Sequence, residues 1–292
     1  MADKMLIAVL LGHIISTPMS ASSVVYSRVN ACGIAAHVVT VNLTDAQTRV
    51  SVALAGGGPG KGESFKSIVG RTHPRAAITG TFFDTRTLMP TGDIAVFGQV
   101  VHTGSVGSAL CIDSRNKAAI VPLAKGRKQS WTGYETVLCC GPALVSRGRV
   151  SVCLRRDGFG RSLSSPARRT AVGITRSGKL LLVAVNGKTT LSRVAKLMLS
   201  IGAVDALSLD GGSSTGFYSN ARFLAVPSRK LTNVLVVYSK SADYETAKTA
   251  LVPASLLPKI AARPVQLDER ALSATTVMPV FEIGISEALE LH

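Results

Sequence analysis

A short segment over residues 206–218, ALSLDGGSSTGFY, combines one acid with small and hydroxylated residues. Its apolar run ends at Asp210, after which come Gly211, Gly212, Ser213, Ser214 and Thr215. An ordinary turn needs only one glycine and one polar residue, so the pattern favours a backbone that another group approaches closely. The hydroxyls could bind phosphate or sugar oxygens. A simpler interpretation also fits, in which Asp210 accepts backbone N–H bonds within a tight turn.

The elements around Asp210 must place it at the edge of a sheet. Apolar residues at helical spacing predict a helix over residues 191–201, with Thr190 as its N-cap and Gly202 as a left-handed C-terminal residue. The segments on either side of this helix have the pattern of strands. If the connection is a parallel crossover, the ends of both strands meet at the same sheet edge.

The wider chain has the pattern of a strand-rich domain. Between residues 24 and 238, short apolar runs are separated by turn residues at intervals of about eight to twelve. Residues 109–121 and 171–185 predict hairpins that turn near residues 114–116 and 177–178. We predict an α+β fold with a single strand-rich domain over residues 24–238 and helices packed on the sheet. Residues 239–292, with four prolines and no sustained period, predict an appendage that wraps the domain or is partly disordered.

The charge balance indicates anionic partners. Lys and Arg number 33 against 17 Asp and Glu, a net charge of +16. Residues 115–169 hold twelve of these basic residues and only two acids. Phosphate esters and polyanionic glycans would suit such a surface, although a solvated basic face is an alternative. Aromatic residues make up 5% of the chain and do not interleave with basic ones. Nucleic-acid binding is therefore expected only as a nonspecific interaction.

The N-terminal segment and the cysteines give information on the cellular compartment of the protein. Residues 1–23 contain Lys4, an apolar run and then small residues, a pattern that predicts a signal peptide and export to the periplasm or outside the cell. An N-terminal strand in a cytoplasmic protein is the alternative. No stretch reaches 18 apolar residues, so no membrane span is expected. Five cysteines without metal-site spacing predict no zinc site, and either buried thiols or a disulfide. No cofactor is predicted, and a metal requirement and the oligomeric state stay open.

Seven segments resemble, in order and approximate spacing, the phosphodiester glycosidase family. They are AAITGTFFD (76–84), CGPALV (140–145), PARRTAVGI (166–174), LLVAVNGK (181–188), the helix before Gly202, ALSLDGGSST (206–215) and RKLTNVLVV (229–237). The resemblance covers residues 26–238 and implies a hydrolase that removes a sugar, such as N-acetylglucosamine, from a glycosyl phosphodiester. An anionic polysaccharide of the envelope or extracellular space would be such a substrate. The departures are Thr79-Gly80-Thr81 for Asn-Gly-Gly, Asn186-Gly187-Lys188 for Asp-Gly-Arg, and Ser213 for a third glycine.

The resemblance assigns catalytic roles to Asp210, Arg169 and Asn186. Asp210 would act as a base, a nucleophile or a stabiliser of an oxocarbenium-like transition state. Arg169 would clamp the phosphate, because a guanidinium fork matches two of its oxygens. A surface basic pair with Arg168 is the alternative interpretation. Since Asn186 replaces an acid, a mechanism that needs two carboxylates is in question, but phosphate leaves readily and one carboxylate could suffice.

The remaining candidates are substrate-binding residues. We expect contacts from Thr79, Thr81, Phe83, Asp84, Gly211, Gly212, Ser213, Ser214 and Thr215. Phe82 and Phe83 are neighbours on an expected strand, so only one of them should face the site. Asp84 and Asp93 are the candidates for a second carboxylate. The alternative function is a non-catalytic binding module for anionic glycans or other polyanions, which lost its chemistry through the replacements at Thr79 and Asn186.

Overall fold

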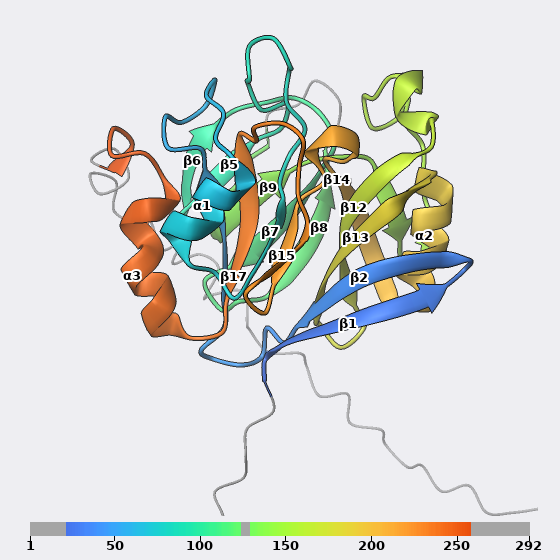
Figure 1. The fold of residues 1–292 in the computed structure, drawn as a ribbon, viewed down its shortest axis with the longest axis horizontal. Helices are drawn as coiled ribbons and strands as arrows, with labels where there is room; N and C mark the ends of the chain where they lie inside the picture. The colour runs from blue at the N-terminus through green and yellow to red at the C-terminus, as the bar shows by residue number, and fades with distance from the viewer. Residues whose placement is uncertain (1–21, 124–128, 258–292) are drawn as a thin grey trace, which may run out of the picture.

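The computed structural model describes residues 22–123 and 129–257, and their strands form three antiparallel sheets (Figure 1). The largest sheet has seven strands in the order β1-β2-β13-β12-β14-β10-β11. Its strands are β1 (Val24–Ala31), β2 (Ile34–Val41), β10 (Ala143–Ser146), β11 (Arg149–Val150), β12 (Ala167–Thr175), β13 (Leu180–Thr189) and β14 (Ala203–Leu209).

The other two sheets have five strands each. The first has the order β16-β15-β4-β17-β3 and the second the order β6-β5-β9-β7-β8. The strands of the first are β3 (Arg49–Leu54), β4 (Ala76–Thr79), β15 (Phe217–Ser219), β16 (Arg222–Ala225) and β17 (Asn233–Tyr238). Those of the second are β5 (Ile94–Val96), β6 (Gln99–His102), β7 (Ser108–Asp113), β8 (Ala118–Pro122) and β9 (Tyr134–Cys139).

One apolar core joins the three sheets. Val39, Ile78 and Leu138, one from each sheet, have no exposed surface in this core. Alternate residues of the strands point to the opposite faces, which helices cover in two of the three sheets. Helix α2 (Leu191–Ser200) covers the seven-stranded sheet, and α1 (Phe65–Thr72) and α3 (Ser241–Leu251) pack on the sheet that contains β17 (Figure 1). Each fully buried Val or Leu in these layers stabilises the fold by about 1.5–3 kcal/mol.

The strand-rich α+β prediction is confirmed, and so are both hairpins. Strands β7 and β8 pair antiparallel, as do β12 and β13, with Gly178 at a φ of 76° in the second turn. The predicted helix is α2, where the Thr190 side chain accepts a hydrogen bond from Arg193 N and Gly202 has a φ of 93°. The sequence pattern did not reveal that the strands divide among three sheets, because strand spacing does not specify which strands pair.

The strand–helix–strand unit that precedes Asp210 is a parallel crossover with a strand inserted in it. Both β13 and β14 pair antiparallel with β12, which lies between them. Strands β13 and β14 therefore run in the same direction, and α2 connects them across one face of the sheet. The C-terminal ends of β13 and β14 consequently lie at the same edge, with the beginning of β12 between them.

The sequence predicted a signal peptide at the N-terminus, an appendage at the C-terminus and no membrane span. The segment predicted as an appendage begins with α3, whose Tyr244, Ala247 and Leu251 are buried in the cluster that also contains α1 and β17 residues. Residues 258–292 lie outside the described residues, as does the expected signal peptide except for residues 22 and 23. No helix in the described part of the chain is long and apolar enough to cross a membrane.

All five cysteines lie in described segments, and each is a free thiol. Cys111, Cys139 and Cys140 are buried, whereas Cys32 and Cys153 are exposed. Burial raises the pKa of the Cys111 and Cys140 thiols to about 12. These two groups are therefore neutral at physiological pH and behave as small apolar side chains.

Candidate active site

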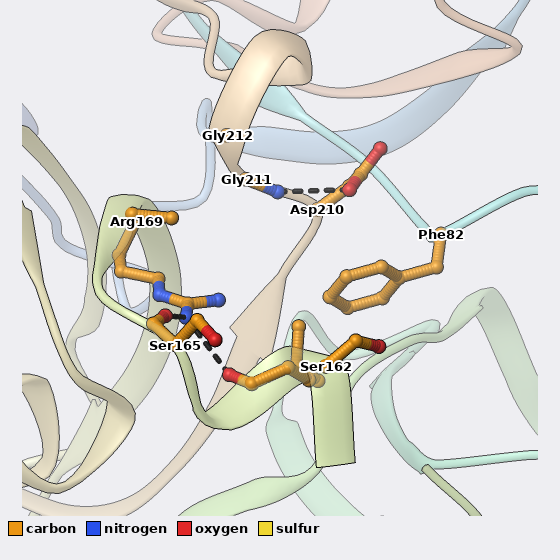
Figure 2. Close-up of a pocket in the computed structure, with 9 residues that line it drawn as sticks. Phe82, Ser162, Ser165, Arg169, Asp210, Gly211 and Gly212 are labelled. Carbon is orange, nitrogen blue, oxygen red and sulfur yellow. Dashed lines mark hydrogen bonds between the residues drawn. The ribbon is translucent and has the colours of Figure 1, made fainter. Parts of the chain in front are cut away.

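Asp210 follows the last residue of β14 and is held there by its backbone. Its N–H donates to the Gly80 carbonyl at 3.0 Å, and its own carbonyl accepts a hydrogen bond from the Thr170 hydroxyl. The carboxylate atom Oδ1 accepts the Gly211 N–H at 2.9 Å, and the residue is only 8% exposed (Figure 2). The fold thus fixes a buried carboxylate at the edge of the sheet.

Glycine is needed at each of the two positions after Asp210 for a different structural reason. A Cβ on Gly211 would lie 2.7 Å from the carbonyl oxygen of Arg168, so the group that approaches this backbone is strand β12 of the same chain. Gly212 has a φ of 59°, a left-handed conformation that glycine adopts without strain. No atom lies within 4 Å of the position its Cβ would take. The first glycine therefore serves packing, and the second serves the turn and leaves open space beside it.

Asp210 lines a pocket of about 180 Å³ (Figure 2). The lining residues are Phe82, Ser162, Leu163, Ser165, Ala167, Arg169, Asp210, Gly211 and Gly212. They come from the segment after β4, from the short 3-10 helix η1 (Arg161–Ser164) with the start of β12, and from the turn after β14. The Phe82 ring packs on Phe159 with centroids 5.4 Å apart, so the segment that carries η1 also positions this phenyl wall.

Arg169 lies across the pocket from Phe82 and is 3% exposed (Figure 2). Its Nε donates to the Thr189 carbonyl at 3.3 Å, and its Nη2 donates to the carbonyls of Leu163, at 2.8 Å, and Ser165. Its Nη1 makes no hydrogen bond with any described residue. Arg169 therefore fastens the η1 wall and retains one nitrogen for a ligand.

The charge state of Asp210 is set by burial. Loss of solvent raises the pKa of the Asp210 carboxyl to about 6, against an ordinary value of 3.8. The nearby Ser214 hydroxyl, the Gly211 N–H and the positive charges of Arg229 and Arg169 act in the opposite direction and limit the rise in pKa. A carboxyl that titrates close to neutral pH is well suited to accept a proton during catalysis.

Thr79 and Thr81, predicted to bind substrate, make buried contacts with the protein. The Thr79 hydroxyl donates to the Ser214 carbonyl at 2.5 Å and accepts the Gly216 N–H at 2.7 Å. The N–H of Thr81 donates to the Asn233 side chain at 3.0 Å. Neither threonine is among the pocket-lining residues. Thr79 instead anchors the turn that follows Asp210.

Asn186 lies in β13 and is exposed, and the pocket lining does not include it. Its Nδ2 donates to the Leu224 carbonyl at 3.0 Å and lies 3.3 Å from Nε2 of His37. The parallel crossover therefore brings Asn186 to the same end of the sheet as Asp210 without placing it in the same pocket.

The three hydroxyl residues that follow the glycines, all predicted to bind substrate, also lie in different environments. Ser213 is exposed, and its carbonyl accepts the Ser228 N–H at 2.9 Å. Ser214 and Thr215 are buried, and their hydroxyl oxygens form no hydrogen bond of normal geometry with the described residues. None of the three lines the pocket, although the preceding Gly211 and Gly212 do.

The pocket wall opposite Arg169 is formed by other residues than the predicted Phe83 and Asp84. Phe82 lines the pocket, whereas Phe83 packs in another core cluster and lies beneath the guanidinium of Arg229. Asp84 is exposed, and its Oδ1 accepts the N–H groups of Arg86 and Thr87, which lowers the pKa of this carboxyl. Asp93 is buried away from the pocket and fully hydrogen-bonded. Asp210 is thus the one carboxylate among the residues that line this pocket.

Sequence reasoning missed the η1 wall and the role of Phe82. The only local signal for that wall is the Gly-rich and Ser-rich stretch GFGRSLSSP, residues 158–166, immediately before β12. Within residues 22–123 and 129–257, no group of three or more His, Cys, Asp or Glu side chains could hold a metal ion.

Comparison with known proteins connects this pocket with a family. The family model described as phosphodiester glycosidase matches residues 72–238, a segment that contains every pocket-lining residue. A 75-residue segment is 37% identical to the N-acetylglucosamine-1-phosphodiester alpha-N-acetylglucosaminidase of Bos taurus. The alignment covers 24% of this chain and only 14% of the bovine protein.

Two solved structures are similar in fold. The catalytic domain of zebrafish N-acetylglucosamine-1-phosphodiester alpha-N-acetylglucosaminidase, auto-inhibited by its pro-peptide, matches with a TM-score of 0.62 and 20% identity. The match covers 77% of this chain and 85% of the zebrafish one. A hypothetical protein from Synechocystis matches with a TM-score of 0.57 and 16% identity, over 73% of this chain and 61% of the other.

Proposed function

Because this chain belongs to the phosphodiester glycosidase family, we propose that it hydrolyses the bond between a sugar and the phosphate of a glycosyl phosphodiester. The products are a free sugar and a phosphate monoester. The observation that carries the proposal is Asp210, a buried carboxylate with a pKa of about 6 that lines the pocket within the family-matched segment.

Asp210 acts as the general base in this proposal. The oxygen of a water molecule attacks the anomeric carbon while a proton passes from that water to the Asp210 carboxylate. The bond between the anomeric carbon and the phosphate oxygen breaks, and its electron pair leaves with the phosphate. Because phosphate is a stable anion, the leaving group needs no separate acid, which agrees with a single carboxylate in the pocket lining.

Arg169 has two roles in this proposal. Its free Nη1 donates to an anionic oxygen of the substrate, and its other nitrogens keep the η1 wall in place. A charge-assisted hydrogen bond of this kind is about twice as strong as a neutral one. The sugar to test first is N-acetylglucosamine, which the names of the bovine and zebrafish relatives contain. An envelope or extracellular phosphodiester glycan is the natural substrate we propose.

Hydrolysis in ¹⁸O-labelled water tests the reaction and the bond that breaks. We expect the purified protein to release N-acetylglucosamine from the methyl ester of its 1-phosphate, with the label in the sugar. Label in the phosphate would contradict cleavage at the anomeric carbon. Failure to release sugar from any of a panel of sugar-1-phosphodiesters would contradict the proposed function itself.

A further inference from the structure

Arg229 lies beside the pocket and near Asp210, next to two of the segments that contribute lining residues. It belongs to the loop between β16 and β17. Its Cζ lies 5.7 Å from the centroid of the Phe83 ring, next in the chain to Phe82 of the pocket wall. The preceding residue, Ser228, donates its N–H to the carbonyl of Ser213 at 2.9 Å. Arg229 is therefore bracketed by the phenylalanine segment and by the turn after Asp210.

The positive charge of Arg229 has no acidic partner among the residues that the structure describes. Arg229 takes part in none of the ion pairs between described residues, and its side chain is exposed. Its charge nevertheless opposes the rise in the pKa of Asp210, ahead of the more deeply buried Arg169. A guanidinium stacked on an aromatic ring keeps its N–H donors free in the plane of the group. An exposed guanidinium that no acid of the described residues neutralises thus lies beside the pocket.

We propose that Arg229 binds the phosphate of a substrate whose sugar occupies the pocket, and makes the enzyme select anionic phosphodiesters over neutral glycosides. This inference rests on the proposed function. When the anomeric carbon–oxygen bond breaks, the leaving phosphate gains a negative charge, and a cation beside it interacts more strongly with the transition state than with the bound substrate. Arg229 therefore contributes to kcat as well as to binding, while Arg169 secures the opposite wall.

The test compares two substrates that share a sugar. One is the methyl ester of N-acetylglucosamine 1-phosphate, and the other is the neutral nitrophenyl glycoside of N-acetylglucosamine. For Arg229→Ala we expect the loss of kcat/KM to be at least about tenfold greater on the phosphodiester than on the neutral glycoside, the usual effect of losing a hydrogen bond to a charged group. Arg229→Lys should restore part of the difference. Lys230→Ala removes the neighbouring exposed cation and is the matched control.

Two further measurements separate this inference from the proposed function. Affinity for inorganic phosphate should fall at least about fivefold in Arg229→Ala and stay unchanged in Lys230→Ala. The titration of Asp210, followed through the pH dependence of stability, should move to higher pH in Arg229→Ala because an opposing positive charge is lost. If wild-type protein hydrolyses no sugar-1-phosphodiester of the panel, the proposed function fails, and these two measurements still decide the role of Arg229.

Equal losses on both substrates would overturn the inference, as would equal effects of Arg229→Ala and Lys230→Ala. An unchanged phosphate affinity in Arg229→Ala would do the same. Selective loss on the phosphodiester, with partial rescue by lysine, supports it.

Discussion

Asp93 and Asp210 are equally buried, at 8% exposure, but their surroundings differ. Both oxygens of Asp93 are occupied, since Oδ1 accepts the Gly104 N–H and Oδ2 accepts the Trp131 indole N–H, each at 2.7 Å. Asp210 accepts one backbone N–H, lines a pocket and has cationic neighbours. Burial alone therefore does not distinguish a functional carboxylate from a structural one. The distinguishing property is a second carboxylate oxygen that accepts no hydrogen bond of normal geometry from the described residues, beside space for a ligand.

Replacement of the two carboxylates by amides should separate them most clearly in activity. Asp210→Asn should lower kcat by about 10²-fold or more, because it removes the group that accepts the proton. Asp93→Asn should retain kcat per folded molecule, because Asp93 lies outside the pocket lining. Steady-state kinetics with a sugar-1-phosphodiester, corrected for the folded fraction by circular dichroism, measures both. Near-full activity in Asp210→Asn would rule out its role as base.

The pH dependence of stability should show the burial of Asp210 directly. The folded pKa of about 6 lies above the ordinary value of 3.8, so the folded state holds its proton more tightly than the unfolded chain does. As pH rises from about 4 to above 6, this carboxyl should lower the free energy of unfolding by about 3 kcal/mol. Urea titrations of wild type and Asp210→Asn at several pH values measure this. The difference between the two curves should be flat if Asp210 does not titrate in this range.

Replacement of Asp93 should have the opposite effect, lowering the stability of the protein without lowering kcat. An amide in place of its carboxylate keeps one acceptor oxygen but sets an NH₂ group against one of the two N–H donors. We expect Asp93→Asn to lower the free energy of unfolding by about 1–3 kcal/mol. Asp210→Asn, which removes a buried charge, should not destabilise the protein at pH 7. Urea denaturation at pH 7 compares the two variants, and a larger loss in Asp210→Asn would reverse their assignments.

The turn beneath Asp210 should contribute the smallest effect. Thr79→Val keeps the side-chain shape but removes the acceptor of the buried Gly216 N–H and the donor to the Ser214 carbonyl. We expect a loss of about 1 kcal/mol in the free energy of unfolding. Activity should fall only as far as the turn moves Asp210. Thermal denaturation at fixed pH checks the stability, and an unchanged melting temperature would show that water replaces both contacts.

The sequence predicted the parts of the fold that local pattern controls. Helix α2 and the β12–β13 hairpin follow from apolar spacing and from turn residues such as Gly178, all within a short stretch of chain. The division into three sheets depends on pairs such as β4 with β17, which lie far apart in the sequence. No local pattern specifies partners at that distance.

The same distinction explains which site residues the sequence revealed. Asp210 stood out because a strand, an acid and two glycines are adjacent in the chain. Phe82 and Arg229 acquire their places only through contacts with Phe159 and Phe83, which depend on tertiary packing. Arg169 was found through the family resemblance, but its bonds to the Leu163 and Ser165 carbonyls could not be read from spacing.

The hydrogen bond between Thr79 and the Ser214 carbonyl joins residues 135 positions apart. Contacts this distant in sequence require the closure of long loops and form slowly during folding. The pocket, built from residues 82 to 212, is therefore assembled only when all of its segments have come together. A ligand bound there stabilises the folded state by about 2.7 kcal/mol at one hundred times its Kd. A bound ligand would thereby reduce the small fraction of the protein that is unfolded and open to proteases.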